Sequence, residues 1–411
     1  MPENVKTCRR NIGARMTNNR NLPTVIVVNQ FALPRSQGGG TRHADIFGNV
    51  DGYDSVIFAG DRNYTTQLKY VADDPRFRLI RVPASDGSGI RRMAGWLVFT
   101  VGAVFASLRV RRVSAVYAST PHLLAPLAGW LTARLRGVPM ILEVRDLWPD
   151  TFATAGAMST SNPVYRILKA LEKFLYRHAD SIVVVAEGWE GHFRSLGADM
   201  SKYQVVPNGT EIREFPVDAD RDEIRVRHGL SGVTAVYAGA HGYANGLDLV
   251  VDAAIQNPTV NFLLIGDGPE KMRLRDLVEG KRLRNVEFRD SMPKSELVEL
   301  LVGCDIGVHC LRAYDALDQG MSPNKIFDYM AAQLPVVSNA GKSARAILGD
   351  DRAFGVATNE NGLAEAIRTV VSCSIKEREA MGQSGRNFVE KNYSRQAAGE
   401  SIRALLKKVE R

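Results

Sequence analysis

The sequence has few cysteines, and they lack the spacing of a disulfide scaffold or a zinc site. Its 411 residues include only Cys8, Cys304, Cys310 and Cys373. No two of them form the short pairs that hold zinc or staple a small secreted fold. This scarcity excludes a cysteine-framed domain and is typical of a reducing compartment.

Long apolar runs are also absent. Residues 1–21 are polar and carry four arginines without the apolar core of a secretory signal, so we expect a disordered tail. The most apolar stretch, residues 93–108, falls short of the ~20 residues that span a bilayer. It permits two interpretations: a buried core helix, which we favour, or a helix lying in the interface of an anionic membrane between its arginine flanks.

Acidic residues are scarce in the first half of the chain. Residues 1–200 hold 25 Lys and Arg against 16 Asp and Glu, whereas residues 201–411 hold 28 against 29. A basic half can face nucleic acid, anionic lipid or a phosphorylated substrate. Because zinc-finger and aromatic RNA-binding patterns are missing, nucleic acid is the least favoured of the three.

Short β-branched runs are present throughout the chain and predict two parallel sheets. The first set of strands is expected at residues 24–28, 56–60, 77–82, 115–118, 140–144 and 181–185, and the second at 235–238, 261–265, 305–309 and 335–337. We therefore expect an α/β fold of two doubly wound domains, one at 22–210 and one at 232–392, joined by a charged linker at 211–231.

Residues 322–338 are the most informative stretch and predict a loop, a helix and a short strand. Pro323 favours a helix start with Ser322 as its N-cap. The helix dipole disfavours a cation in the first turn, so Lys325 there indicates a bound phosphate. Asp328, one turn later, is placed to accept hydrogen bonds from sugar hydroxyls. The alternative is an ordinary surface helix packed on a strand.

Three further segments are candidate ligand sites. The loop after the first strand contains Gly39 and Gly40, although it could also be merely flexible. Arg145 and Asp146 end a predicted strand, where ligands of open α/β sheets gather; the alternative is an interdomain salt bridge. A lone His122 after another strand is more often structural.

A glycine-rich loop before the predicted helix 247–254 is typical of a phosphate cradle. Its candidate residues are Gly239, His241 and Gly242.

The motifs Arg145-Asp-Leu-Trp-Pro and Pro323-Asn-Lys-x-Phe-Asp-Tyr-Met-Ala-Ala resemble those of the family 4 retaining glycosyltransferases, in the branch that builds O-antigen and capsule. The resemblance implies a GT-B fold of two Rossmann-like domains facing a cleft. It implies retaining transfer of a hexosyl or N-acetylaminosugar group from a nucleoside diphosphate sugar, preferably UDP-linked, to a lipid-linked or glycan acceptor. No metal or other cofactor is expected, and the location would be cytoplasmic or peripheral at the inner face of the plasma membrane.

The resemblance also assigns residues. Ser322, Pro323, Asn324 and Lys325 would lie at the diphosphate and Asp328 at the ribose. Arg145 would lie near the donor sugar, and a catalytic role for Asp146 is a hypothesis.

Further positions follow from the same resemblance. The loop of Gly39 and Gly40 would lie between the domains near the phosphates. The step Gly266-Asp267-Gly-Pro would line the donor site, and the segment with Ser291 and Met292 would read the base through its backbone. Residues 207–209 would form the hinge, and a helix at about 393–411 would pack back on the first, acceptor-binding domain.

Three positions depart from the family pattern. Gly320 occupies the place of a donor-site glutamate, and Ala240 and Asn245 occupy those of an arginine and a lysine. These departures favour a rival hypothesis, a non-catalytic partner subunit or glycan-binding relative, and a nucleotide-sugar epimerase or hydrolase is a milder alternative. The two branch-specific motifs argue against both.

Overall fold

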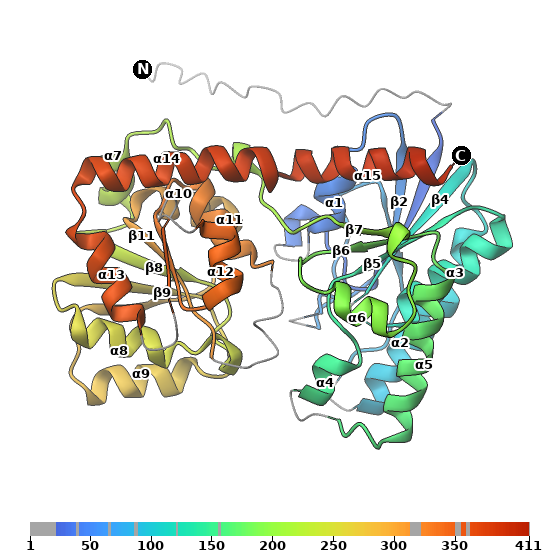
Figure 1. The fold of residues 1–411 in the computed structure, drawn as a ribbon, viewed down its shortest axis with the longest axis horizontal. Coiled ribbons are helices and arrows are strands. Elements are labelled where there is room, and N and C mark those ends of the chain that lie inside the picture. Colours follow the sequence, from blue (N-terminus) through green and yellow to red (C-terminus); the bar gives the residue numbers. More distant parts are fainter. Residues whose placement is uncertain are drawn as a thin grey trace, which may run out of the picture.

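The computed structural model shows two α/β halves side by side, each built around a parallel sheet (Figure 1). It describes residues 22–37, 41–64, 67–85, 89–120, 122–154, 158–312, 322–349, 355–358 and 362–410. The expected tail at 1–21 and the candidate residues Gly39 and Gly40 lie outside these ranges. The predicted fold class is confirmed.

The first sheet has seven parallel strands in the described part of the chain. Their spatial order is β3 (Phe77–Ile80), β2 (Asp54–Gly60), β1 (Thr24–Val28), β4 (Val113–Ser119), β5 (Met140–Val144), β6 (Ser181–Val184) and β7 (Tyr203–Val205). Every residue of β1, β5 and β6 is buried, as expected for strands covered by helices on both faces.

The second sheet has six parallel strands among the described residues. They follow the order β10 (Val286–Arg289), β9 (Val260–Ile265), β8 (Val233–Ala238), β11 (Ile306–His309), β12 (Val336–Ser338) and β13 (Gly355–Ala357). Both sheets thus reverse their strand order beside their first strand, at β1/β4 and at β8/β11. In open α/β sheets such a reversal opens a crevice at the carboxyl ends of the strands, where ligands bind.

Helices cover both faces of each sheet (Figure 1). The first half carries α1 (Arg42–Phe47), α2 (Gly89–Ser107), α3 (Leu124–Arg136), α4 (Asp150–Thr154), α5 (Pro163–His178) and α6 (Glu190–Ser195). The second half carries α7 (Arg221–Arg227), α8 (Asp248–Gln256), α9 (Lys271–Gly280), α10 (Lys294–Gly303), α11 (Asn324–Ala331), α12 (Gly341–Leu348), α13 (Leu363–Ser372) and α14 (Ile375–Asn392). The last helix, α15 (Arg395–Val409), lies on the first half.

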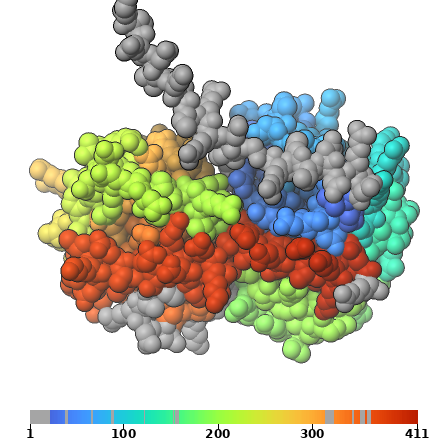
Figure 2. Space-filling view, turned by 90° about the horizontal axis from the view of Figure 1, so that it is seen from above, coloured from blue at the N-terminus to red at the C-terminus, as the bar shows by residue number. Residues whose placement is uncertain are grey.

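Two segments cross between the halves and contact each other. The red helices α14 and α15 run over the second and then the first half (Figure 2). At their junction Thr210 N–H donates to the Tyr393 carbonyl at 2.9 Å, and Arg395 N–H donates to the Thr210 carbonyl at 3.1 Å. A Cβ on Gly209 would lie 2.0 Å from the Tyr393 oxygen, so only glycine fits this crossing.

The preferred interpretation of residues 93–108 as a buried core helix is wrong for one face. Phe99 and Ala103 of α2 are buried, but Leu97, Val101 and Phe105 are 53%, 54% and 64% exposed. A sequence that is apolar all round does not reveal which face its neighbours cover. In the ranges that the structure describes, no helix combines the length and apolarity needed to cross a membrane.

Two smaller expectations also need correction. Helix α11 begins one residue later than predicted, with Pro323 rather than Ser322 at its N-cap. The Ser322 hydroxyl accepts instead from Asn208 N–H. The expected linker at 211–231 contains helix α7, which packs against α10.

Candidate functional site

The switch point of the second sheet brings Lys325 against the glycine-rich loop after β8. Lys325 Nζ lies 2.9 Å from Tyr237 Oη and 3.3 Å from Asn245 Oδ1, and 4.4 Å from the centre of the Tyr237 ring. A Cβ on Gly239 would lie 3.3 Å from the same Nζ. Burial lowers the pKa of Lys325 to about 8, and among the described residues no carboxylate lies within ion-pair distance of it.

Two glycine loops pass over each other beside this lysine. A Cβ on Gly266 would lie 2.0 Å from the Gly239 carbonyl oxygen, so the backbones touch where the two loops cross. His241 is completely buried beneath the crossing, and its N–H donates to the Asp267 carbonyl at 2.9 Å. Gly242 precedes the short 3-10 helix Tyr243–Asn245. The loop therefore presents backbone groups rather than charged side chains.

The segment after β10 joins this line of residues through Asp267. Its carboxylate accepts from Lys271 Nζ and from Ser291 Oγ, each at 2.8 Å. Hydrogen bonds from Lys271 and Ser291 hold the pKa of Asp267 well below its usual range. Met292 packs on the core of the second half. Lys325, Gly239, Gly266, Asp267 and Ser291 thus form one continuous edge.

The hinge contacts both ends of the motif around α11. Asn208 donates from its N–H to Ser322 Oγ and from Nδ2 to the Ser322 carbonyl, both at 2.8 Å. Asp328 accepts from Thr210 Oγ1 at 2.6 Å and from Lys294 Nζ at 2.5 Å. Pro323 and Asn324 begin the helix between these contacts. Lys294 and Thr210 were not predicted as site residues, because nothing in their local sequence marks them.

Arg145 and Asp146 follow β5 at the carboxyl edge of the first sheet. Asp146 is exposed, yet protein atoms crowd the space around it; the loss of water raises the pKa of its carboxyl, and Arg145 lowers it in part. In the described residues neither side chain forms an ion pair with the second half. Arg395, which lies at the crossing, is within electrostatic range of both Arg145 and Asp328. The candidate residues of the two halves therefore face a common region.

A buried carboxylate lies just below this edge and was missed by sequence reasoning. Glu143 is 0% exposed and contacts Arg42 Nε at 2.9 Å, His43 Nε2 at 2.8 Å, Tyr117 Oη at 2.7 Å and Ser119 Oγ at 2.6 Å. Burial alone would raise its pKa, but attraction first from Arg42 and then from His43 holds it well below the usual range. A lone glutamate in an otherwise apolar strand was the signal that could have revealed it.

Arg42 extends this network to the hinge. Its guanidinium donates to the carbonyl oxygens of Val206 at 2.8 Å and Pro207 at 2.7 Å. The helix α1 that carries it follows the loop of Gly39 and Gly40. The network thus fixes the hinge relative to the strand ends, which makes it a scaffold for the site.

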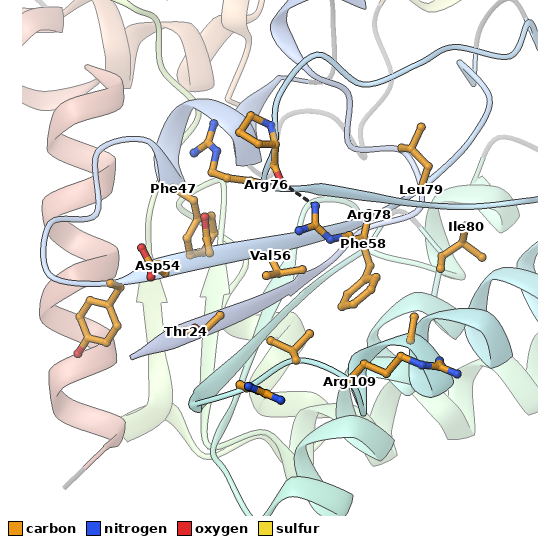
Figure 3. Close-up of a pocket in the computed structure, with 16 residues that line it drawn as sticks. Thr24, Phe47, Asp54, Val56, Phe58, Arg76, Arg78, Leu79, Ile80 and Arg109 are labelled. Atoms are coloured by element: carbon orange, nitrogen blue, oxygen red, sulfur yellow. Dashed lines mark hydrogen bonds between the residues drawn. The ribbon is translucent and has the colours of Figure 1, made fainter. Parts of the chain in front are cut away.

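A separate cavity lies at the opposite, amino edge of the first sheet (Figure 3). Four arginines line it, among them Arg78 and Arg109, and it faces away from the strand ends described above. Nowhere in the described ranges do three or more histidine, cysteine or carboxylate side chains cluster as metal ligands would.

Two family models match the chain. Residues 49–209 match the Glycosyl transferase 4-like domain, and residues 232–373 match the Glycosyl transferases group 1 domain. The chain is 23% identical over 308 residues to the probable glycosyltransferase WbjE of Pseudomonas aeruginosa, covering 73% of this chain and 76% of WbjE. It is 24% identical over 256 residues to the putative colanic acid biosynthesis glycosyl transferase WcaI of Escherichia coli K12, covering 59% of this chain and 62% of WcaI.

Solved structures share the fold at low sequence identity. Sucrose-phosphate synthase from Thermosynechococcus elongatus has a TM-score of 0.71 at 18% identity, covering 94% of this chain and 99% of its own. Alr3699/HepE of Anabaena, crystallised with UDP and glucose, has a TM-score of 0.67 at 16% identity, covering 94% and 100%. The chain therefore belongs to the GT-B glycosyltransferases, with a glycosyl transferase 4-like domain followed by a glycosyl transferases group 1 domain.

Proposed function

We propose that this protein is a retaining glycosyltransferase of cell-surface polysaccharide synthesis. It transfers a hexosyl or N-acetylaminosugar group from a nucleoside diphosphate sugar, preferably UDP-linked, to a lipid-linked or glycan acceptor. The name of WcaI includes colanic acid biosynthesis, and the HepE structure contains UDP and glucose. Both support the proposal by analogy.

The observation that carries the proposal is the charge of Lys325, which no carboxylate in the part of the chain that the structure describes neutralises. Its Nζ contacts a phenol and an amide oxygen rather than a carboxylate, beside a glycine loop and in the first turn of α11. A half-buried cation in this setting is stabilised when an anion binds, and backbone N–H groups at a helix start add to that attraction. A diphosphate leaving group supplies such an anion, and Lys325 then stabilises the charge that develops as the sugar leaves.

The remaining residues take supporting roles. Asp328 accepts hydrogen bonds from the ribose in competition with Thr210 and Lys294, which donate to it in the structure. The carboxyl of Asp146 has a raised pKa and lies beside Arg145 at the end of β5, where the two side chains orient the donor sugar. No metal is required in this scheme, which follows the family resemblance.

A thermal-shift series with UDP, GDP, ADP and dTDP tests the donor site. Ligand at one hundred times its Kd stabilises the folded state by about 2.7 kcal/mol, which gives a readily visible shift. We expect one nucleotide, UDP, to raise the melting temperature, and Lys325→Met to reduce the rise. A melting temperature unchanged by all four nucleotides would instead support the partner-subunit hypothesis.

We also propose that the first half docks on an anionic membrane through α2. The exposed stripe of Met93, Leu97, Val101 and Phe105 recurs every four residues, so it forms one face of the helix. Arginines flank it at both ends, and Arg109 leads into the basic cavity of Figure 3. An apolar face between cationic ends is suited to the headgroup region of an anionic bilayer, at the cytoplasmic side of the membrane.

A further inference from the structure

Five aromatic rings form a continuous chain along the carboxyl edge of the first sheet. The ring centres of Tyr64 and Phe31 are 5.7 Å apart, as are those of Phe31 and His122. His122 stacks on Trp96 at 4.8 Å, and Trp96 meets Trp148 edge to face at 5.6 Å. We call these five residues the aromatic ridge.

The ridge follows the order of the strands rather than the order of the sequence. Tyr64, Phe31, His122 and Trp148 come from the loops after β2, β1, β4 and β5, which are neighbours in that order, and Trp96 comes from α2. The ridge therefore crosses the β1/β4 switch point, where open α/β sheets bind ligands. It ends three residues from Arg145, beside the site proposed for sugar transfer.

The rings are not simply a piece of core. His122 is 1% exposed, donates through Nε2 to Gln30 and accepts from Ala125 N–H, so it is a fixed spacer between Phe31 and Trp96. Tyr64 is 50% exposed, and the other three rings are only partly buried. Aromatic surface left open at a ligand edge, over a rigid centre, is suited to stacking on an apolar partner.

We propose that the aromatic ridge binds the acceptor, and that the acceptor is a lipid-linked sugar. The C–H face of the sugar stacks on Trp96 and Trp148, and the lipid leaves the site along the exposed face of α2. This inference rests on the proposed function, because it names the acceptor of that same site.

The position of Trp96 on α2 favours a lipid-linked acceptor over a free glycan. Leu97 and Val98, its neighbours on the helix, are 53% and 45% exposed, so the ridge and the apolar face of α2 are continuous. The guanidinium of Arg92, one turn earlier, lies 5.7 Å from the Trp96 ring centre. A phosphate between lipid and sugar would meet this cation.

Titration calorimetry on the full chain tests the inference with defined probes. The probes are farnesyl diphosphate linked to glucose, farnesyl diphosphate linked to N-acetylglucosamine, farnesyl diphosphate alone, and UDP. We expect at least one sugar-linked probe to bind more tightly than farnesyl diphosphate. We expect Trp96→Leu and Tyr64→Leu each to weaken that probe by about fivefold to tenfold, with the Kd of UDP unchanged.

Trp130→Leu is the matched control. Trp130 packs on Phe174 at 4.8 Å, on α3 and away from the ridge, so it should leave both affinities unchanged. The acceptor inference is overturned if no farnesyl probe binds the wild type, or if both ridge variants bind the sugar-linked probe as the wild type does. If UDP did not bind the wild type, the donor assignment would be overturned instead. The titrations with the farnesyl probes would still show whether the aromatic ridge binds the acceptor.

Discussion

Each half of the molecule shields a charged side chain from water close to the candidate site, Glu143 fully and Lys325 in part, and the two differ in their partners. In the first half Glu143 is satisfied by Arg42, His43, Tyr117 and Ser119. In the second half Lys325 contacts a tyrosine hydroxyl and an asparagine oxygen, and no carboxylate of the described residues pairs with it. A buried charge with all its hydrogen bonds made is part of the architecture, whereas a shielded charge without a counter-charge is suited to bind an oppositely charged ligand.

The surfaces of the two halves also differ in chemistry, one being apolar and aromatic and the other rich in backbone N–H groups. The first half exposes the apolar stripe of α2 and the aromatic ridge, which suit a lipid-linked acceptor. The second half presents glycine loops and helix starts, which suit phosphate. Under the two proposals above, each half would handle one substrate and the hinge would bring the two together.

Removing the carboxylate of Glu143, whose four partners all lie within hydrogen-bond distance, is expected to have the largest effect on stability. Glu143→Ala leaves the buried guanidinium of Arg42 without its counter-charge, with only backbone carbonyls as partners. We therefore expect the free energy of unfolding to fall by about 3–5 kcal/mol. Urea unfolding of the purified variants measures the loss. Glu287→Ala removes an exposed ion-pair partner in the second half, and it should cost about 1 kcal/mol or less. Equal losses in the two variants would contradict the comparison.

Removing Lys325, which has no carboxylate partner among the residues that the structure describes, is expected to affect catalysis instead. Lys325→Ala should lower turnover by about 10²–10³, as the loss of one preorganised donor to a developing charge does. Its melting temperature should not fall, because an uncompensated charge leaves the interior. Lys376→Ala, on the exposed side of α14, is the control. Turnover near that of the wild type would remove Lys325 from the mechanism.

The pKa of Lys325 predicts how donor binding depends on pH. Its value in the free protein is about 8, and a bound phosphate favours the protonated form and so raises it. The Kd of UDP should therefore be constant below pH 8 and should rise about tenfold per pH unit above it. Calorimetry from pH 7 to 9 measures this slope. Lys325→Met should flatten the profile, and an unchanged slope in that variant would assign the titration to another group.

Charges placed on the apolar face of α2 are expected to give the smallest effect. Leu97→Glu with Val101→Glu should weaken binding to vesicles rich in anionic lipid by about tenfold, without changing the melting temperature. Added salt should weaken the wild type as well, since the flanking arginines contribute. Ile375→Glu, at a residue 66% exposed in the second half, should leave vesicle binding unchanged. Sedimentation with the vesicles distinguishes these outcomes.

The sequence by itself determined the two-sheet fold, ten of the thirteen strands of the described residues and the motif around Lys325, but it missed the edge strands β7, β10 and β13. Apolar β-branched runs report burial on both faces, and proline, glycine and a first-turn lysine act within a few residues of one another. Each of these signals is local, so it can be recognised without knowing what lies across the sheet. The prediction of strand β5 at residues 140–144 is confirmed to the residue.

Only the tertiary structure decided which side chains meet. Arg42 and Glu143 are 101 residues apart, and the rings of the aromatic ridge come from five separate segments that the strand order brings side by side. The apolar sequence of α2 likewise did not show which face its neighbours would leave open. Contacts of this kind depend on sheet order and packing, and local sequence patterns do not encode either of them.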